Sequence, residues 1–190
     1  DGIAFIDPKS SQLDIIQSVG RAIRKIKGAI TEKKGTIIIP VFISEGENTE
    51  ERILKSNFKP VWEVLRALRA HDEELAEKLD EFRTNLARKQ IPVSRTIDDR
   101  IIFDLPISVG ADFSKAIKNV VVEHSTSSWE YMYGLLINFF EEYSHSNVPY
   151  YYEDKDNLAK WVSTQRSFKK INDLSDERVE KLNKLQFSWD

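Results

Sequence analysis

The sequence contains no cysteine among its 190 residues. Without thiols it has no disulfide framework and no thiolate metal site, which fits a reducing compartment. It also lacks a stretch that is long and apolar enough to span a bilayer, and it carries no signal-peptide pattern. We therefore expect a soluble, cytoplasmic protein with no membrane partner.

The sequence has little net charge as well. Its 28 Lys and Arg residues nearly balance its 31 Asp and Glu residues, and the formal net charge is -3. The chain as a whole therefore does not attract nucleic acid, and any such binding must come from a local basic face. With 41% hydrophobic and 31% charged residues, the composition is that of a charge-rich globular protein.

The first residues have the pattern of a strand, a helix and a second strand. Residues 3–7 form an apolar run, a helix capped by Ser11 is expected from about Leu13 to Lys27, and residues 36–43 form a second apolar run. Such a unit pairs its strands in parallel. The second run is either a fully buried strand or an edge strand, because it contains Pro40.

The chain begins inside the first apolar run, with no Met and no capping residue before it. A parallel strand at a free terminus would leave backbone groups and apolar faces unpaired. We therefore expect the chain to be a fragment of a longer protein.

Residues 49–124 are expected to form a mostly helical connecting region. Pro60 suits the first turn of a helix, and another helix is expected from Phe113 to about His124. Residues 91–108 break the helical pattern and indicate short strands or a hairpin. The best linker candidate is the run of Ser and Thr at residues 125–128.

Residues 125–190 contain three helical patterns, each with one Trp in or beside it. Ser175 is expected to cap the third helix. The sequence thus predicts a C-terminal three-helix bundle and a chain that is mostly α overall. The Trp side chains are expected in the core, and Gln165 is expected as a buried amide satisfied by backbone.

The most specific signal is the segment QSVGRAIR, residues 17–24. On a helix, Gln17, Arg21 and Arg24 are spaced i, i+4 and i+7 and share one face. Gly20 permits close approach of a ligand or another backbone. Guanidinium groups stay charged and bind phosphate oxygens in pairs, so this face suits a phosphate. The alternative is a basic helix face exposed to solvent. The roughly opposite face, expected to lie toward a sheet, carries Ile16, Val19, Ile23 and Ile26.

The pattern Q-x-x-G-R-x-x-R between two apolar runs resembles motif six of bacterial superfamily-2 helicases of the DEAD/DEAH type. The upstream stretch DGIAFIDPKSSQLDI resembles the segment that follows motif five in the same enzymes. The resemblance implies that residues 1–48 are the C-terminal part of a second RecA-like domain, an α/β fragment.

The same resemblance implies roles for individual residues. Arg21 and Arg24 would face the γ-phosphate of ATP, bound with Mg²⁺ on the first RecA-like domain upstream in the parent protein. Arg24 would act as an arginine finger, Gln17 would position the nucleotide, and Gly20 would lie beside it. An arginine supplied across a cleft stabilises the charge of phosphoryl transfer only when the cleft is closed.

The sequence contains no G-x-x-x-x-G-K-[ST] and no D-E-x-H string. The parts of a helicase that hold ATP and Mg²⁺ therefore belong outside this chain. We expect the chain alone to bind neither and to hydrolyse no ATP. Two classes of function remain open: part of a helicase motor, or a non-catalytic nucleic-acid-binding or regulatory module whose helicase-like half is only structural.

A second resemblance covers the C-terminal region. Its landmarks are Trp129-Glu130, Phe140-Glu-Glu-Tyr143, Val148-Pro149, Asn157-Leu-Ala-Lys-Trp161-Val, Gln165-Arg166, Leu174-Ser175-Asp-Glu-Arg178 and Leu185-Gln-Phe187-Ser-Trp189. They resemble the bacterial helicase-associated domain, a trihelical module that follows such motors. This chain has Ala159 and Gln186 where that family commonly has Gly. The resemblance implies binding to nucleic acid, with DNA as the expected partner.

The charges between residues 157 and 170 are all positive. They are Lys160, Arg166, Lys169 and Lys170, the candidate nucleic-acid-binding residues. The alternative is a solvated helix face. No metal site is expected, because His71, His124 and His145 are isolated. Tyr150, Tyr151 and Tyr152 are expected in a loop that packs on the bundle, and contact with a partner is the alternative.

Overall fold

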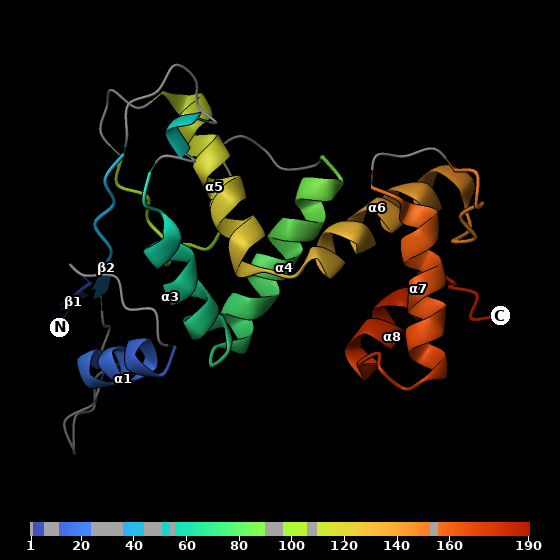
Figure 1. Ribbon diagram of the computed structural model, residues 1–190, viewed down its shortest axis with the longest axis horizontal. Coiled ribbons are helices and arrows are strands. Elements are labelled where there is room, and N and C mark those ends of the chain that lie inside the picture. The colour runs from blue at the N-terminus through green and yellow to red at the C-terminus, as the bar shows by residue number, and fades with distance from the viewer. Residues whose placement is uncertain are drawn as a thin grey trace. The chain divides into compact units, whose positions relative to one another are not determined.

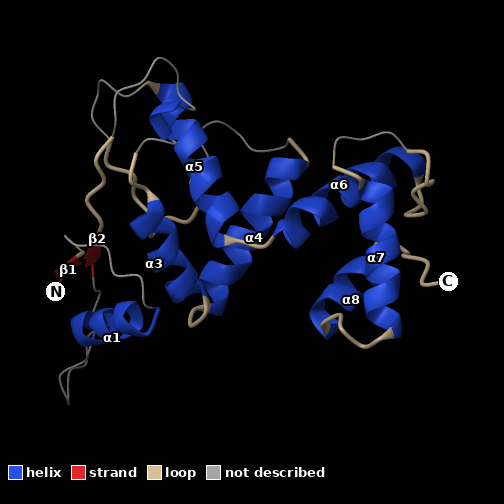
Figure 2. Cartoon of the chain, in the orientation of Figure 1, coloured by secondary structure: helices blue, strands red, loops and turns tan. Residues whose placement is uncertain are grey.

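The computed structural model describes residues 2–5, 12–23, 36–43, 51–53, 56–89, 97–105, 110–152 and 156–190 (Figure 1). Helices dominate these residues (Figure 2), which confirms the prediction of a mostly α-helical chain. The chain divides into two compact units. Unit 1 comprises Asp1–Leu79 and Thr96–Thr126, and unit 2 comprises Asp80–Arg95 and Ser127–Asp190. The domain boundaries expected after residues 48 and 124 stay predictions.

Unit 1 begins with the expected strand, helix and strand. Strand β1 (Gly2–Ala4) pairs in parallel with strand β2 (Thr36–Ile38), and Ile3 lies opposite Ile37. Helix α1 (Gln12–Ile23) lies between the two strands in the sequence. This pairing confirms the predicted parallel arrangement. The long connection between the two strands is of the kind that parallel strands need.

Both strands are shorter than predicted. Residues 39–43 are not in a strand, and Phe42 is 85% exposed. Ile38, at the end of β2, is 56% exposed. The fully buried alternative for the second apolar run is therefore wrong in this part of the chain. Pro40 gives the physical reason, because it has no N–H to donate to a ladder. Ser11 and residues 24–27, the expected cap and end of the first helix, lie outside the described residues.

Helices α3 (Lys59–Arg69) and α5 (Ala111–Ser125) contribute to a hydrophobic core of unit 1. Pro60 lies in the first turn of α3 as predicted, where its missing N–H leaves no hydrogen bond unmade. Helix α5 confirms the helix expected near residues 113–124. The most deeply buried side chains of this core are Phe58, Phe113, Ile117 and Val121.

Helix α4 (Glu73–Ala87) begins at a polar network. Asp72 accepts a hydrogen bond from the backbone N–H of Leu75 at 2.9 Å, as a capping residue does. Asp98 has a fully buried side chain that accepts from Arg100 Nε at 3.0 Å and Nη2 at 2.8 Å. Arg100 also pairs with Asp72 at 3.0 Å. The hydrogen bonds from Arg100 hold the pKa of Asp98 well below its usual range.

This network occupies part of the segment for which short strands were expected. Residues 97–105 are not in a strand, and the other residues of the segment, 91–96 and 106–108, lie outside the described ranges. Buried charge, rather than strand pairing, holds this segment in place. The sequence pattern of Pro and β-branched residues did not distinguish the two.

Unit 2 contains helices α6 (Ser128–Tyr143), α7 (Leu158–Lys170) and α8 (Asp176–Asn183). They lie where the three helical patterns were predicted. Ser127 caps α6 by accepting from Trp129 N, and Ser175 caps α8 by accepting from Arg178 N, as expected. The buried members of their shared core are Trp129, Leu136, Phe139, Val148, Leu158, Val162, Leu174, Leu182, Leu185 and Phe187.

The linker expected at residues 125–128 is shorter than predicted. Ser125 is the last residue of α5 and Ser128 the first of α6, so only Thr126 and Ser127 lie between the helices. The hydroxyl of Ser125 is buried and donates to the carbonyl of Val121 at 2.7 Å. Ser125 therefore ends one helix and Ser127 caps the next. In sequence, serines in these two roles look like a linker.

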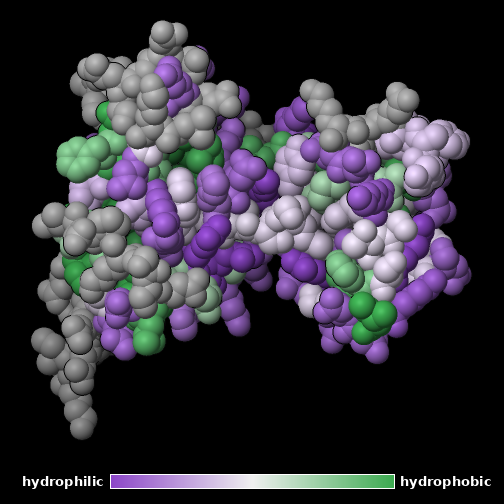
Figure 3. All heavy atoms as spheres, viewed as in Figure 1, coloured by the Kyte–Doolittle hydropathy of each residue, from purple (hydrophilic) through white to green (hydrophobic). Residues whose placement is uncertain are grey.

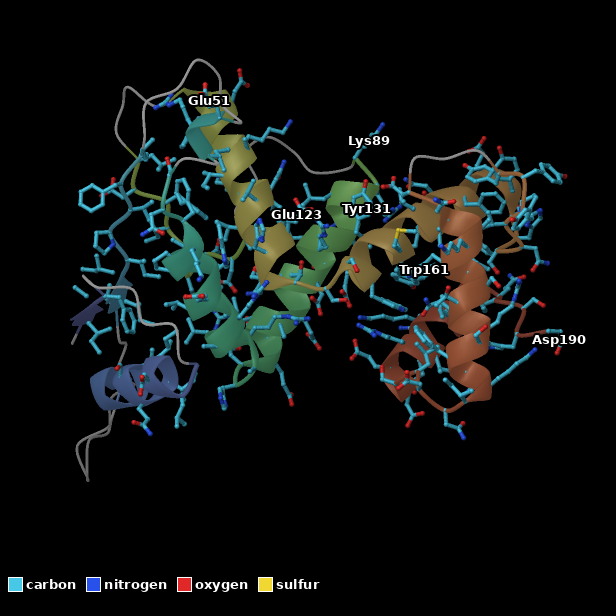
Figure 4. The ribbon with its side chains drawn as sticks, viewed as in Figure 1. Glu51, Lys89, Glu123, Tyr131, Trp161 and Asp190 are labelled. Carbon is cyan, nitrogen blue, oxygen red and sulfur yellow. The ribbon has the colours of Figure 1, made fainter. Side chains whose placement is uncertain are left out.

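Within unit 2, the second half of α4 packs closely on α6. A Cβ added at Gly134 would lie 2.4 Å from the backbone oxygen of Thr84 and 2.8 Å from Cβ of Ala87. Thr84 Oγ1 donates to the carbonyl of Glu130 at 3.2 Å. Tyr131, marked in Figure 4, has the guanidinium of Arg83 4.8 Å from its ring centroid. Glycine is therefore needed at position 134 for the approach of the two helices.

Candidate functional site

The helicase-like candidate residues lie on or just beyond helix α1. Gln17, Gly20 and Arg21 belong to this helix, and the side chain of Gln17 is exposed. Arg21 follows Gln17 by four residues, about one helical turn. Arg24 lies outside the described residues. The structure thus brings three of the four candidates onto one short helix.

The opposite face of α1 is the apolar one. Ile15 is 0% exposed and Val19 is 7% exposed. They share a core with Val64 and Ala67 of α3 and with Phe5 after β1. Ile16 was expected on this face, but Ile15 is buried more deeply, and Ile16 is only partly buried. Packing on both the strands and α3 broadens the buried face beyond the spacing that was counted.

This arrangement fits a helix that offers a polar face to a phosphate. Gln17 is exposed, whereas Ile15 and Val19, two residues before and after it in the sequence, are buried in the core. An amide supplies both a donor and an acceptor, and a fixed helix presents them in a defined direction. Among the candidate residues for the ATP site, Gln17 is the one whose side chain the structure describes, and its exposure is compatible with facing a phosphate.

The nucleic-acid-binding candidates lie on α7 and differ in their surroundings. Lys160, Lys169 and Lys170 are exposed, whereas Arg166 is half-buried. Helix α7 contains no Asp or Glu, so no carboxylate of its own neutralises these charges. The side chains of the first and last turns of α7 therefore contribute only positive charge.

Arg166 makes contacts within the protein. Its Nε donates to the carbonyl of Ser188 at 2.8 Å, and its Nη2 donates to Asn147 Oδ1 at 3.3 Å. The guanidinium also lies 5.5 Å from the ring centroid of Phe187. Arg166 is half-buried because these contacts attach the C-terminal tail to α7. Lys169 lies 6.0 Å from the ring centroid of Trp189 in the same tail.

The face of α7 opposite Lys160 is fixed in the core. Leu158 is 2% exposed, Val162 is 0% exposed and Gln165 is 2% exposed. The ring of Trp161, marked in Figure 4, lies 5.7 Å from that of Trp129. Because α7 is held along its length, its outer face has one defined orientation.

Two cations that sequence reasoning missed lie over the ring of Trp129. Arg178 is 5.0 Å and Lys181 is 5.8 Å from the ring centroid. Arg178 Nη2 also donates to Ser127 Oγ at 3.3 Å. Such cation–π contacts stabilise the joint between α6 and α8. Neither residue has a local sequence signal for this contact, because Trp129 is far away in the chain.

Glu130 is a buried carboxyl beside the same joint, at 5% exposure. Burial raises its pKa, and the nearby charge of Asp80 raises it further. The hydroxyl of Ser127 and the charge of Arg178 act in the opposite direction. Ser127 and Glu130 have the spacing of a capping box, which explains an acid at this position.

Two of the three consecutive tyrosines do not pack on the helices, contrary to the prediction. Tyr150 is 96% exposed and Tyr151 is 84% exposed. Only Tyr152 packs, edge-on against Phe139 at 5.1 Å. A turn closed by the hydrogen bond from Tyr152 N to Pro149 O carries the two exposed rings at its tip.

The histidines have individual structural contacts. His124 stacks on Trp62 at 4.4 Å, and His145 Nδ1 accepts from Asn147 N at 3.2 Å. Within the described ranges, no group of three or more His, Cys, Asp or Glu residues could hold a metal ion. In the same ranges, no helix has the length and apolarity needed to cross a membrane.

Comparison with known proteins gives one result for the C-terminal region. Residues 126–190 match the family model of the helicase associated domain. No curated protein and no solved structure matches the chain. The matched region contains α6, α7, α8 and the C-terminal tail. The C-terminal region of this chain is therefore helicase-related.

Proposed function

We propose that this chain is the C-terminal part of an ATP-dependent nucleic-acid helicase of superfamily 2. The observation that carries the proposal is the match of residues 126–190 to the helicase associated domain. In this account α6, α7 and α8 form the trihelical module, and the positive charge of α7 contacts nucleic acid. The absence of any carboxylate from α7 supports that role.

The N-terminal residues form the end of a second RecA-like domain in this account. Parallel pairing of β1 with β2, with α1 between them, supports it. So does the position of Gln17, which is exposed on α1 opposite a buried face. The helicase motif alone would also fit a solvated basic helix, but the helicase associated domain further along the same chain favours the motor.

Arg21 and Arg24 then act on ATP held with Mg²⁺ by the first RecA-like domain of the full-length protein. The bound nucleotide supplies the phosphoryl group that is transferred to water. The guanidinium groups stabilise the negative charge that develops on the phosphoryl oxygens. Gln17 orients the nucleotide through its exposed amide. Because the chain has no phosphate-binding loop of its own, the purified chain is expected to hydrolyse no ATP.

The test replaces Arg21 or Arg24 with Ala in the full-length protein and measures ATP hydrolysis and ATP binding separately. Loss of an arginine that acts in the transition state lowers turnover by about a thousandfold or more. Nucleotide binding should be retained within a few-fold. The matched control is Lys115→Ala, which removes an exposed cation from α5.

Turnover within twofold of the wild type in both arginine variants would refute the motor role. The helicase-like half would then be structural, and the chain would be a nucleic-acid-binding or regulatory module. ATP hydrolysis by the purified chain that survives both substitutions would also contradict the proposal.

A further inference from the structure

Helix α7 presents a cationic outer face with charge at both ends and short hydroxyl side chains between. Lys160 and Lys170 are exposed, and so are Ser163 and Ser167 between them. Spacings of three, four and three residues place these four side chains along one side of a helix. Over the middle of α7 the surface is pale and only weakly polar (Figure 3).

The distance between the two lysines suits a groove between two phosphate chains. Lys170 follows Lys160 by ten positions in the helix, which corresponds to a rise of about 15 Å along the axis. The major groove of B-form DNA is about 12 Å wide and admits an α-helix. Lysine side chains at the two ends can therefore reach phosphates on either side of a groove in which the helix lies.

The short side chains at the centre allow the helix to approach the base edges. The hydroxyl of Ser167 donates to the carbonyl of Ser163 at 3.2 Å, so it lies close to the helix and does not project as a long chain would. A serine oxygen can accept from or donate to base edges in the groove. No acidic side chain of α7 would oppose the DNA phosphates.

We propose that α7 binds in the major groove of duplex DNA, with Lys160 and Lys170 on the phosphate chains and Ser163 and Ser167 toward the bases. The inference rests on the proposed nucleic-acid-binding role of this region and specifies its substrate. Single strands are bound through stacked aromatic side chains, and this line of α7 carries none between Lys160 and Lys170. Duplex RNA is disfavoured, because its deep, narrow major groove does not admit a helix.

The test measures binding of the whole chain to three probes of one sequence: duplex DNA of about 20 base pairs, the corresponding single strand, and duplex RNA. Fluorescence anisotropy should give the tightest binding for duplex DNA. Changing both lysines to Gln should raise its Kd at least about tenfold and lower the salt slope by about two. The control Lys184→Gln removes an exposed cation after α8 and should change the Kd less than twofold.

Ser163→Leu with Ser167→Leu tests insertion into the groove without changing charge. The added side chains should weaken binding to duplex DNA several-fold, whereas Ser128→Leu, at an exposed position of α6, should not. Methylation of guanine N7, which lies in the major groove, should be protected in the complex. Circular dichroism of each variant should match the wild type.

The outcomes separate the two proposals. If the wild-type chain binds none of the probes at low salt, the nucleic-acid-binding function itself is refuted. If it binds but prefers single strands or duplex RNA, or leaves guanine N7 unprotected, the function stands and the major-groove inference is wrong.

Discussion

The indole Nε1 of Trp129 donates a hydrogen bond to Oε1 of Gln165 at 2.9 Å inside the core of unit 2. Gln165 is 2% exposed, and its Nε2 donates to the carbonyl of Trp161 at 3.3 Å. The buried amide is thus satisfied at both ends, once by a side chain and once by backbone. The pair joins α6 to α7.

Trp129→Phe and Gln165→Leu should each lower the free energy of unfolding. Each substitution leaves one buried polar group without its partner, which costs about 1–3 kcal/mol. The double variant removes both groups, so its loss should be smaller than the sum of the two single losses. Urea unfolding followed by circular dichroism measures all four proteins. Strict additivity would show that the hydrogen bond is not an energetic link.

Gly134→Ala should destabilise unit 2 even though Ala favours helix by about 1 kcal/mol. The new Cβ would lie 2.4 Å from the backbone oxygen of Thr84, so the two helices must separate. We expect a loss of about 2 kcal/mol or more, typical of overpacking. Gly110→Ala is the control, because nothing lies within 4 Å of its added Cβ. An equal or smaller loss at position 134 would contradict the close helix contact.

Gln186→Gly should stabilise the chain or leave it unchanged. Gln186 has φ 51°, a left-handed backbone conformation that residues other than glycine adopt at a cost of about 1–2 kcal/mol. Glycine removes this cost but adds about 0.5–1 kcal/mol of unfolded-state entropy. Ala159→Gly, inside α7, has no such relief and should lower the stability by about 1 kcal/mol. Thermal unfolding of both variants decides; a Gln186→Gly loss as large as that of Ala159→Gly would contradict this account.

These cases show what could be predicted from sequence. The caps at Ser175 and Pro60, the parallel strand pairing and the positions of α6, α7 and α8 follow from local residue preferences and periodicity. A left-handed residue at Gln186 was marked only by departure from a family's glycine. Such features depend on a few neighbouring residues.

Long-range contacts could not be predicted in the same way. Arg166 looked like a free cation of α7, but it holds Ser188 in the C-terminal tail. Arg178 lies over Trp129, and nothing near either residue in sequence indicates it. Tyr150 is exposed at the tip of a turn, although the three tyrosines were expected to pack on the bundle. Tertiary packing decides each of these positions.

Asp98→Asn should remove a pH-dependent part of the stability of unit 1. The pKa of Asp98 is lowered in the fold by its hydrogen bonds with Arg100, so the folded state favours the ionised form. Its contribution is complete above the unfolded pKa of about 3.9 and is lost as pH falls below it. The wild type should therefore be more stable than the Asn variant above about pH 4, and this difference in stability should shrink progressively as the pH falls below that value. Urea midpoints at several pH values measure this, and a constant difference down to pH 2 would contradict the assigned pairing.

We propose that an ATP-hydrolysing motor acts together with a DNA-binding α7. The most direct test is DNA-stimulated ATP hydrolysis by the full-length protein. With Lys160 and Lys170 changed to Gln, the duplex DNA concentration for half-maximal stimulation should rise at least about tenfold. With Arg24 changed to Ala, hydrolysis should be lost at every DNA concentration. Two results would contradict the account: half-maximal stimulation of the lysine variant at the same DNA concentration as the wild type, or ATP hydrolysis by the arginine variant at the wild-type rate.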